Sequence, residues 1–139
     1  MNASFEEKSV WIQLIGTIVS LGLYFIVAGK MLSNGINMLP AFVPVFIVAV
    51  VLIVLVNVTG HVVVAIVSGP EGRDERDRLI EWRAESKSSW ILGAGVIIAI
   101  NAMILSVDNV WIAHFLLLSL FICEVVKDVC QLVYYRRGI

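Results

Sequence analysis

Four long apolar runs constrain this chain of 139 residues more than any other feature. They cover about residues 10–32, 41–68, 89–107 and 110–134. Each has close to the roughly 20 residues that a helix needs to cross the hydrocarbon core of a bilayer. A backbone in lipid must satisfy its own hydrogen bonds, which a helix does within one segment. The sequence therefore predicts an all-α fold, an integral membrane four-helix bundle that forms a single domain.

The composition agrees with this prediction, because 60% of the residues are hydrophobic whereas soluble domains are only about 45–50% apolar. The second run is rich in valine and isoleucine, which favour strands in water. Its length and its lack of alternation indicate a helix instead. Ser33-Asn34-Gly35 ends the first run, and Val107-Asp108-Asn109 is a predicted tight turn between the third and fourth runs.

The orientation is predicted from lysine and arginine in the short connections, which favour the cytoplasmic side. The opposite connections offer only Lys30, at the edge of the first run. We therefore expect both termini and the segment 69–88 to face the cytoplasm. The basic residues that support this are Lys8, Arg73, Arg76, Arg78, Arg83, Lys87, Arg136 and Arg137.

The segment from Arg73 to Lys87 holds ten charged side chains in fifteen positions, five of each sign. Asp74 is a plausible helix N-cap with Asp77 three residues later. Neither glycine nor proline occurs between Asp74 and Trp90. The sequence therefore predicts that the third helix begins in the cytoplasm and continues into the membrane without a break.

This charged segment has two interpretations that the sequence leaves open. It is either a solvated helix that only fixes the topology, or a docking surface for a cytoplasmic protein or a second copy. The charge of this segment does not suit nucleic acid, because acidic and basic residues are equal in number and nucleic-acid-binding surfaces need excess positive charge. We therefore predict no nucleic-acid partner. The candidate partner-binding residues are Asp74, Glu75, Arg76, Asp77, Arg78, Glu81 and Arg83.

The stretches Asp74-Glu75-Arg76-Asp77, Leu79-Ile80-Glu81 and Arg83-Ala84-Glu85 resemble a family of small uncharacterised prokaryotic membrane proteins. Its members have four predicted spans and a DERD-type loop before the third span, and are often encoded beside small helix-turn-helix regulators. The resemblance implies a multi-pass protein of the prokaryotic inner membrane with a regulatory or sensing role. It implies no particular enzymatic activity.

Polar residues inside the apolar runs form a second candidate site, because such residues usually face the interior of a bundle. His61 lies about 30 Å along its run from Ala41, and Glu124 about 21 Å along its run from Val110, which places them at similar depths. The set could form a polar site for protons or a divalent cation, or Glu124 and Lys127 could simply neutralise each other. The candidate residues are Asn57, His61, Glu124, Lys127 and Asp128.

The chain carries no recognisable catalytic or metal-binding motif, so we expect no enzymatic activity, cofactor or metal. His114 is expected at the outer membrane interface. Gly16-xxx-Ser20 and Gly95-xxx-Ala99 are patterns that allow close helix packing. The preferred function is a non-enzymatic accessory or regulatory membrane protein, a homo-oligomer or a subunit of a membrane complex, that acts through its charged segment. The alternative is a small oligomeric transporter or channel component with a polar site at His61 and Glu124.

Overall fold

The computed structural model describes residues 5–68 and 74–137, and every regular element within these ranges is helical. Four helical stretches are long and apolar enough to cross a membrane. The predicted all-α, four-helix fold is therefore confirmed. The elements are α1 (Phe5–Ser33), the short 3₁₀-helix η1 (Leu39–Phe42), α2 (Val43–Ser68), α3 (Glu75–Ile104) and α4 (Asn109–Arg137).

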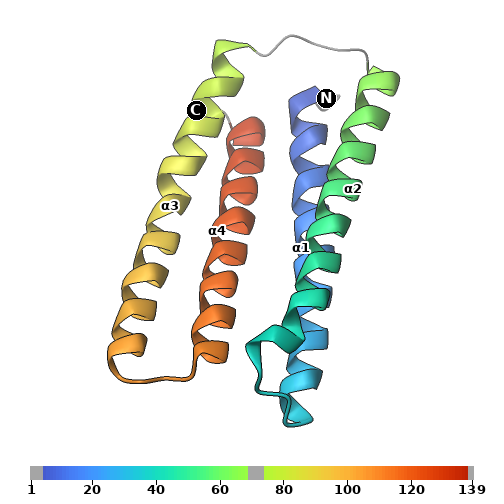
Figure 1. Ribbon diagram of the computed structural model, residues 1–139. Coiled ribbons are helices and arrows are strands. Elements are labelled where there is room, and N and C mark those ends of the chain that lie inside the picture. Colours follow the sequence, from blue (N-terminus) through green and yellow to red (C-terminus); the bar gives the residue numbers. More distant parts are fainter. Residues whose placement is uncertain (1–4, 69–73, 138–139) are drawn as a thin grey trace.

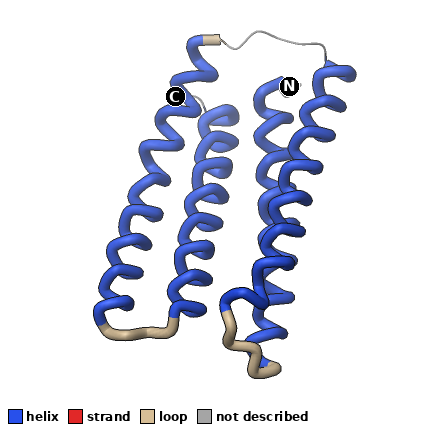
Figure 2. The backbone as a smooth tube through the Cα atoms, viewed as in Figure 1, coloured by secondary structure: helices blue, strands red, loops and turns tan. Residues whose placement is uncertain are grey.

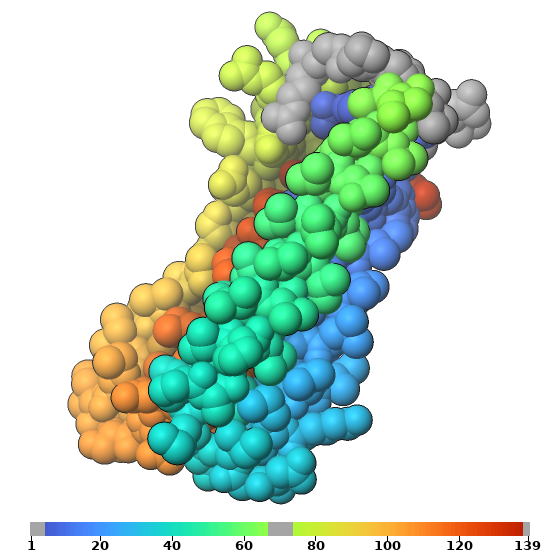
Figure 3. All heavy atoms as spheres, turned by 45° about the vertical axis from the view of Figure 1, so that its right-hand side comes forward, coloured from blue at the N-terminus to red at the C-terminus, as the bar shows by residue number. Residues whose placement is uncertain are grey.

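The helices form two antiparallel hairpins, α1–α2 and α3–α4, which meet mainly through α1 and α4 (Figure 1). The start of α1, the end of α2, the start of α3 and the end of α4 lie together, and we call this the terminal end (Figure 2). The loop end carries the connections at residues 34–38 and 105–108. Figure 3 shows α2 lying across one face of the bundle, so much of its apolar surface stays exposed.

Capping side chains explain where α3 begins. The Asp74 carboxylate accepts a hydrogen bond from the backbone N–H of Glu75 at 2.7 Å, and the Asp77 carboxylate accepts one from the N–H of Asp74 at 3.0 Å. Together they form a capping box, which satisfies N–H groups that a helix start leaves open. The predicted N-cap and the unbroken passage of this helix through Trp90 are both confirmed. Residues 69–73 of the predicted segment lie outside the described residues.

The end of α3 differs from the prediction. The helix stops at Ile104, three residues before the expected end at Val107, because Ser106 adopts a left-handed conformation with φ 58°. The N–H of Ser106 bonds to the carbonyl of Met103 and the N–H of Val107 bonds to that of Ala102, which is a Schellman motif. Glycine usually occupies this left-handed position at a helix end, so the serine in the sequence did not indicate that the helix ends here.

Close helix approaches occur where the small-residue patterns predict them. A Cβ atom added to Gly16 of α1 would lie 2.9 Å from Val56 of α2, and one added to Gly60 of α2 would collide with Ile12 of α1. Small side chains therefore set the separation within the α1–α2 hairpin. Three pairs fix the antiparallel register of α3 against α4, namely Asp77 with Tyr135, Ser88 with Cys123, and Gly95 with Ser119.

Candidate functional site

A polar cavity of about 140 Å³ lies at the terminal end, where all four α-helices contribute to its wall. Only one of its ten lining residues, Val10, is apolar. The polar lining residues are Glu6, Ser9 and Gln13 of α1, His61 of α2, Asp77 and Glu81 of α3, and Lys127, Gln131 and Tyr135 of α4. The cavity therefore joins two groups of residues that the sequence analysis treated as separate sites.

Helical periodicity explains why these side chains converge. Residues three or four apart share a helix face, and this spacing relates Asp77 to Glu81 and Lys127 to Gln131. Asp77 and Glu81 were predicted as partner-binding residues, whereas Lys127 was predicted as an intramembrane group. The structure turns all of them toward the same enclosed space.

Hydrogen bonds across the cavity tie the helices together. The Ser9 hydroxyl and His61 Nδ1 are 2.6 Å apart, which links α1 to α2. The Tyr135 hydroxyl donates to the Asp77 carboxylate at 3.1 Å, which links α4 to α3. Glu6 and Glu81 also take part in further interactions. The cavity wall is therefore a cross-linked polar network and not a loose gap between helix ends.

The sequence left open whether His61 meets Glu124, and the two side chains do not bond in this arrangement. Glu124 forms an ion pair with Lys127 one turn along α4, which is the contact that the simpler interpretation, local neutralisation, requires. Across residues 5–68 and 74–137, no hydrogen bond or ion pair joins His61 to Glu124. Asn57 donates its amide N–H to the carbonyl of Ile53 at 2.9 Å, within its own helix.

Asp128 is the most unusual residue near the cavity. Its side chain is 0% exposed, and both carboxylate oxygens lack a hydrogen-bond partner. It lies on the face of α4 that also carries Gln131 and Tyr135, three and seven residues further on, and both of these line the cavity. The register of α3 against α4 places it at the level of Ala84, whose side chain is also fully buried. Asp128 is not one of the residues that line the cavity, and its carboxylate is enclosed in the protein core.

The first turns of α3 have two different faces. Ile80 and Ala84 are fully buried in the bundle, whereas Trp82 is 76% exposed and Leu79 is 41% exposed. In Figure 3 the side chains at the start of α3 stand away from the rest of the molecule. We call this exposed side the outward face of α3; its charged residues are Glu75, Arg76, Arg78, Arg83 and Glu85.

At the loop end, His114 is buried inside the bundle near the start of α4. Its expected position at the outer membrane interface stays a prediction. Its Nδ1 lies 2.7 Å from the carbonyl oxygen of Val110, which can only accept. Nδ1 therefore carries the proton, and Nε2 accepts from the Tyr24 hydroxyl at 3.2 Å. The Phe42 ring packs edge-on against the imidazole at 4.7 Å between centroids. No sequence signal relates Tyr24 to His114, because they are 90 positions apart.

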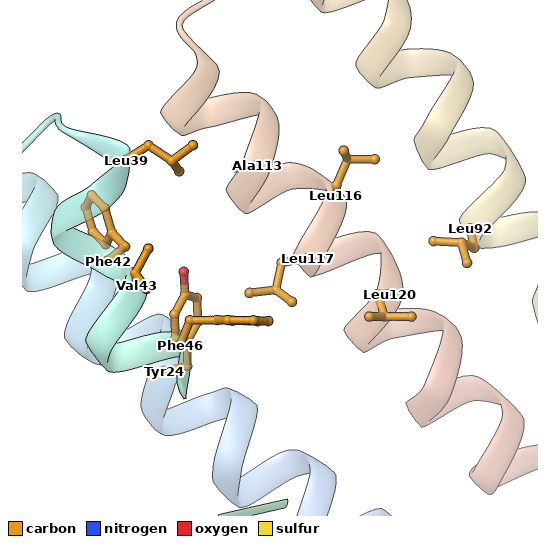
Figure 4. Close-up of a pocket in the computed structure, with 10 residues that line it drawn as sticks. All are labelled: Tyr24, Leu39, Phe42, Val43, Phe46, Leu92, Ala113, Leu116, Leu117 and Leu120. Atoms are coloured by element: carbon orange, nitrogen blue, oxygen red, sulfur yellow. The ribbon is translucent and has the colours of Figure 1, made fainter. Parts of the chain in front are cut away.

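An apolar groove of about 560 Å³ lies beside this pair. Figure 4 shows Phe42 and Val43 on one wall and Leu117 and Leu120 of α4 on the other. The groove lies between the two hairpins, and its only polar atom in view is the Tyr24 hydroxyl. The loop end thus presents hydrocarbon where the terminal end presents polar groups.

Comparison of the chain with models of protein families, with curated proteins and with solved structures finds no match. The resemblance to small four-span prokaryotic proteins therefore stays a prediction. The functional argument depends on the geometry of the chain itself.

Proposed function

We propose that this chain is a non-enzymatic accessory or regulatory protein of the prokaryotic inner membrane, with both termini in the cytoplasm. In this proposal the terminal end is the cytoplasmic end, and the outward face of α3 binds a cytoplasmic protein. The observation that carries the proposal is the division of the α3 extension into a buried face and an exposed face that combines Trp82 and Leu79 with charges of both signs.

The length of the helices supports the membrane orientation. Between Lys8 and Lys30, α1 rises about 33 Å, which matches the roughly 30 Å hydrocarbon core of a bilayer. Lysine and arginine lie overwhelmingly at the terminal end, as cytoplasmic segments require. With Lys8 at the cytoplasmic boundary, the first turns of α3 lie at or beyond the headgroups. The polar cavity extends from that boundary into the span as far as Gln13, about 7.5 Å beyond Lys8.

The composition of the outward face supports a protein partner. Tryptophan and arginine are the side chains that most often carry binding energy at protein interfaces. Charged side chains around an apolar centre select a partner with the complementary pattern and suppress others. The balanced charge argues against a purely electrostatic attachment to anionic lipid, which needs an excess of basic residues.

Site-directed photo-cross-linking in intact cells tests this proposal. A photoreactive residue at Leu79 or Trp82 should cross-link to the same cytoplasmic protein. Arg76→Glu combined with Arg83→Glu should reduce that product at least tenfold, because two of the three arginines of the outward face become acidic. Lys30→Glu, at the opposite end, is the matched control and should leave the product unchanged.

Two results would contradict the docking proposal. One is a cross-linked product that survives the double charge reversal while the protein stays in the membrane at normal abundance. The other is the absence of any product at both outward positions while a probe at the inward Ile80 gives only intramolecular cross-links.

The geometry supports the transporter alternative less well. That alternative needs a polar site built from His61 and Glu124, yet each bonds to a different residue. The polar cavity also reaches only part of the way along the bundle, because Tyr24, Phe42 and Val110 fill the core at the loop end. We therefore retain the accessory role. Assembly into a homo-oligomer or a larger membrane complex is part of this proposal, and the exposed apolar side of α2 is compatible with it.

A further inference from the structure

We propose that the apolar groove at the loop end holds one acyl chain of a bilayer phospholipid. This inference rests on the membrane location proposed for the chain, and it is independent of docking at the outward face of α3. Three properties of the groove carry the inference: its position along the spans, its hydrocarbon lining and its size.

The groove lies within one leaflet of the bilayer. At 1.5 Å per residue, its lining residues on α4, from Ala113 to Leu120, lie about 6 to 17 Å from the start of that helix at Asn109. Leu92 of α3 lies about 18 Å from the end of its helix at Ile104. Each leaflet supplies half of a hydrocarbon core of roughly 30 Å. The groove therefore extends from just inside the membrane interface to about the midplane, which is the depth that the chains of one leaflet occupy.

A membrane-spanning helix of a partner matches this depth less well. Such a helix crosses both leaflets, whereas every lining residue of the groove belongs to the half of the bundle nearest to the loop end. The other half of the bundle carries the polar cavity. An acyl chain of one leaflet is therefore the occupant whose length the groove matches.

The lining of the groove excludes a polar occupant. Nine of its ten residues carry hydrocarbon side chains, and the tenth is Tyr24, whose hydroxyl donates to His114 at 3.2 Å. No side chain of the lining therefore has a free hydrogen-bond donor. A water molecule needs about two to four polar partners, so apolar cavities stay dry, and a polar group placed here would lose its hydrogen bonds. Hydrocarbon is the chemistry that the groove accepts.

The size of the groove matches a long chain. Its volume of about 560 Å³ is nearly four times the roughly 150 Å³ of a cavity that encloses one benzene molecule. An unfilled space of this size would forfeit dispersion contacts of all the atoms that line it. Because the bilayer supplies acyl chains at this depth, a chain of one of its phospholipids fills the groove.

Contacts inside the protein hold the walls of the groove in place. The Phe42 ring packs edge-on against His114 at 4.7 Å between centroids, and the Phe46 ring packs edge-on against Tyr24 at 6.1 Å. Leu117 of α4 belongs to the facing wall (Figure 4). Lipid tails are as apolar as leucine, so hydrophobic burial gives the chain no preference for the groove over the bilayer. Its preference comes from dispersion contacts with fixed walls on two sides, and we expect it to be more ordered than other lipid chains around the protein.

Photo-cross-linking to lipid tests the proposal on the full-length chain. The protein is reconstituted in phosphatidylcholine vesicles that contain a phosphatidylcholine with a diazirine in the middle of one acyl chain, and mass spectrometry maps the cross-linked positions. We expect at least fivefold more product at Leu117, which lines the groove, than at Leu118, which is more exposed. Fluid lipid without an ordered site would label the two residues in the order of their exposure. The same chain on phosphatidylglycerol should give the same pattern, because the lining contacts only the chain.

Two variants and their matched controls locate the chain. Leu120→Trp and Leu118→Trp each change a leucine of α4 that is 39% exposed, but only Leu120 lines the groove. Leu120→Trp should lower the product at Leu117 at least fivefold, because the indole takes the place of the chain, and Leu118→Trp should leave it unchanged. Val43→Trp, on the opposite wall, should also lower it, and Val51→Trp, outside the lining, is its control. Circular dichroism establishes that each variant retains its helices, and Val43→Trp keeps the test decisive if Leu120→Trp does not fold.

Three results would overturn the proposal. Product at Leu117 that does not exceed that at Leu118, or that survives both groove substitutions, would show that no ordered chain lies in the groove. Product at Leu117 that rises as the protein is diluted in lipid would assign the groove to a second copy of this chain. Labelling of neither Leu117 nor Leu118 would contradict the membrane location itself, and the groove proposal would fail with it, whereas labelling of Leu118 alone contradicts only the groove proposal.

Discussion

The two ends of this bundle treat buried polar side chains in opposite ways. At the loop end, Tyr24 and His114 satisfy each other and the imidazole also bonds to the backbone of Val110. At the terminal end, Asp128 is fully buried, and neither of its carboxylate oxygens has a hydrogen-bond partner within residues 5–68 and 74–137. A satisfied buried polar pair stabilises a unique arrangement, whereas a buried carboxylate without hydrogen bonds costs free energy.

The two ends of the bundle also differ in the property that we expect their side chains to control. The loop-end cluster joins both hairpins, because Tyr24 belongs to α1, Phe42 to η1 and His114 to α4. The terminal end joins its helices through polar contacts around a cavity, namely Ser9 with His61 at 2.6 Å, Tyr135 with Asp77 at 3.1 Å and Arg136 with Glu7 at 3.4 Å. We therefore expect substitutions at the loop end to change stability and substitutions at the terminal end to change binding.

The largest expected effect is at Phe42, which is only 2% exposed. Replacing it with alanine should lower the free energy of unfolding by about 3 kcal/mol, because it removes a buried aromatic side chain and leaves a cavity. Phe46→Ala is the matched control, since Phe46 is 40% exposed and should cost less than about 1 kcal/mol. Denaturant unfolding in detergent measures both, and equal losses would contradict the picture of a packed loop end.

A smaller loss is expected at His114. His114→Leu should lower the free energy of unfolding by about 1–2 kcal/mol, because it leaves the buried Tyr24 hydroxyl without its acceptor. In a double-mutant cycle, Tyr24→Phe should cost much less in the His114→Leu background than in the wild type. If the two losses simply add, the Tyr24–His114 bond does not contribute to stability.

Sequence reasoning succeeded where local patterns decide the structure. Run length set the number of helices, and the acidic residues at positions 74 and 77 set the start of α3. The small residues Gly16 and Gly95 indicated where helices approach closely. Each of these patterns involves residues of one helix or of one helix contact, so it can be recognised in a single amino-acid sequence.

The candidate site was only partly predictable, because it depends on which helix faces meet. Periodicity grouped Glu124, Lys127 and Asp128 on α4, but it could not show that Glu124 turns to Lys127 while Asp128 enters the core. Depth along the spans allowed His61 to meet Glu124 without predicting it, whereas the approach of α2 to α1 brings His61 to Ser9. The rotation of each helix about its own axis, which decides the face it turns to its neighbours, is set by packing of the whole bundle. No local sequence pattern encodes that rotation.

In the last prediction, the expected change in stability has the opposite sign to the changes at the loop end. Asp128→Val should raise the free energy of unfolding by about 1 kcal/mol, because it replaces a buried carboxylate that has no hydrogen-bond partner with an apolar side chain. Denaturant unfolding of the wild type and of Asp128→Val in detergent measures this difference. A loss of stability in Asp128→Val would mean that the carboxylate already has a stabilising partner, and the two ends would then obey the same rule.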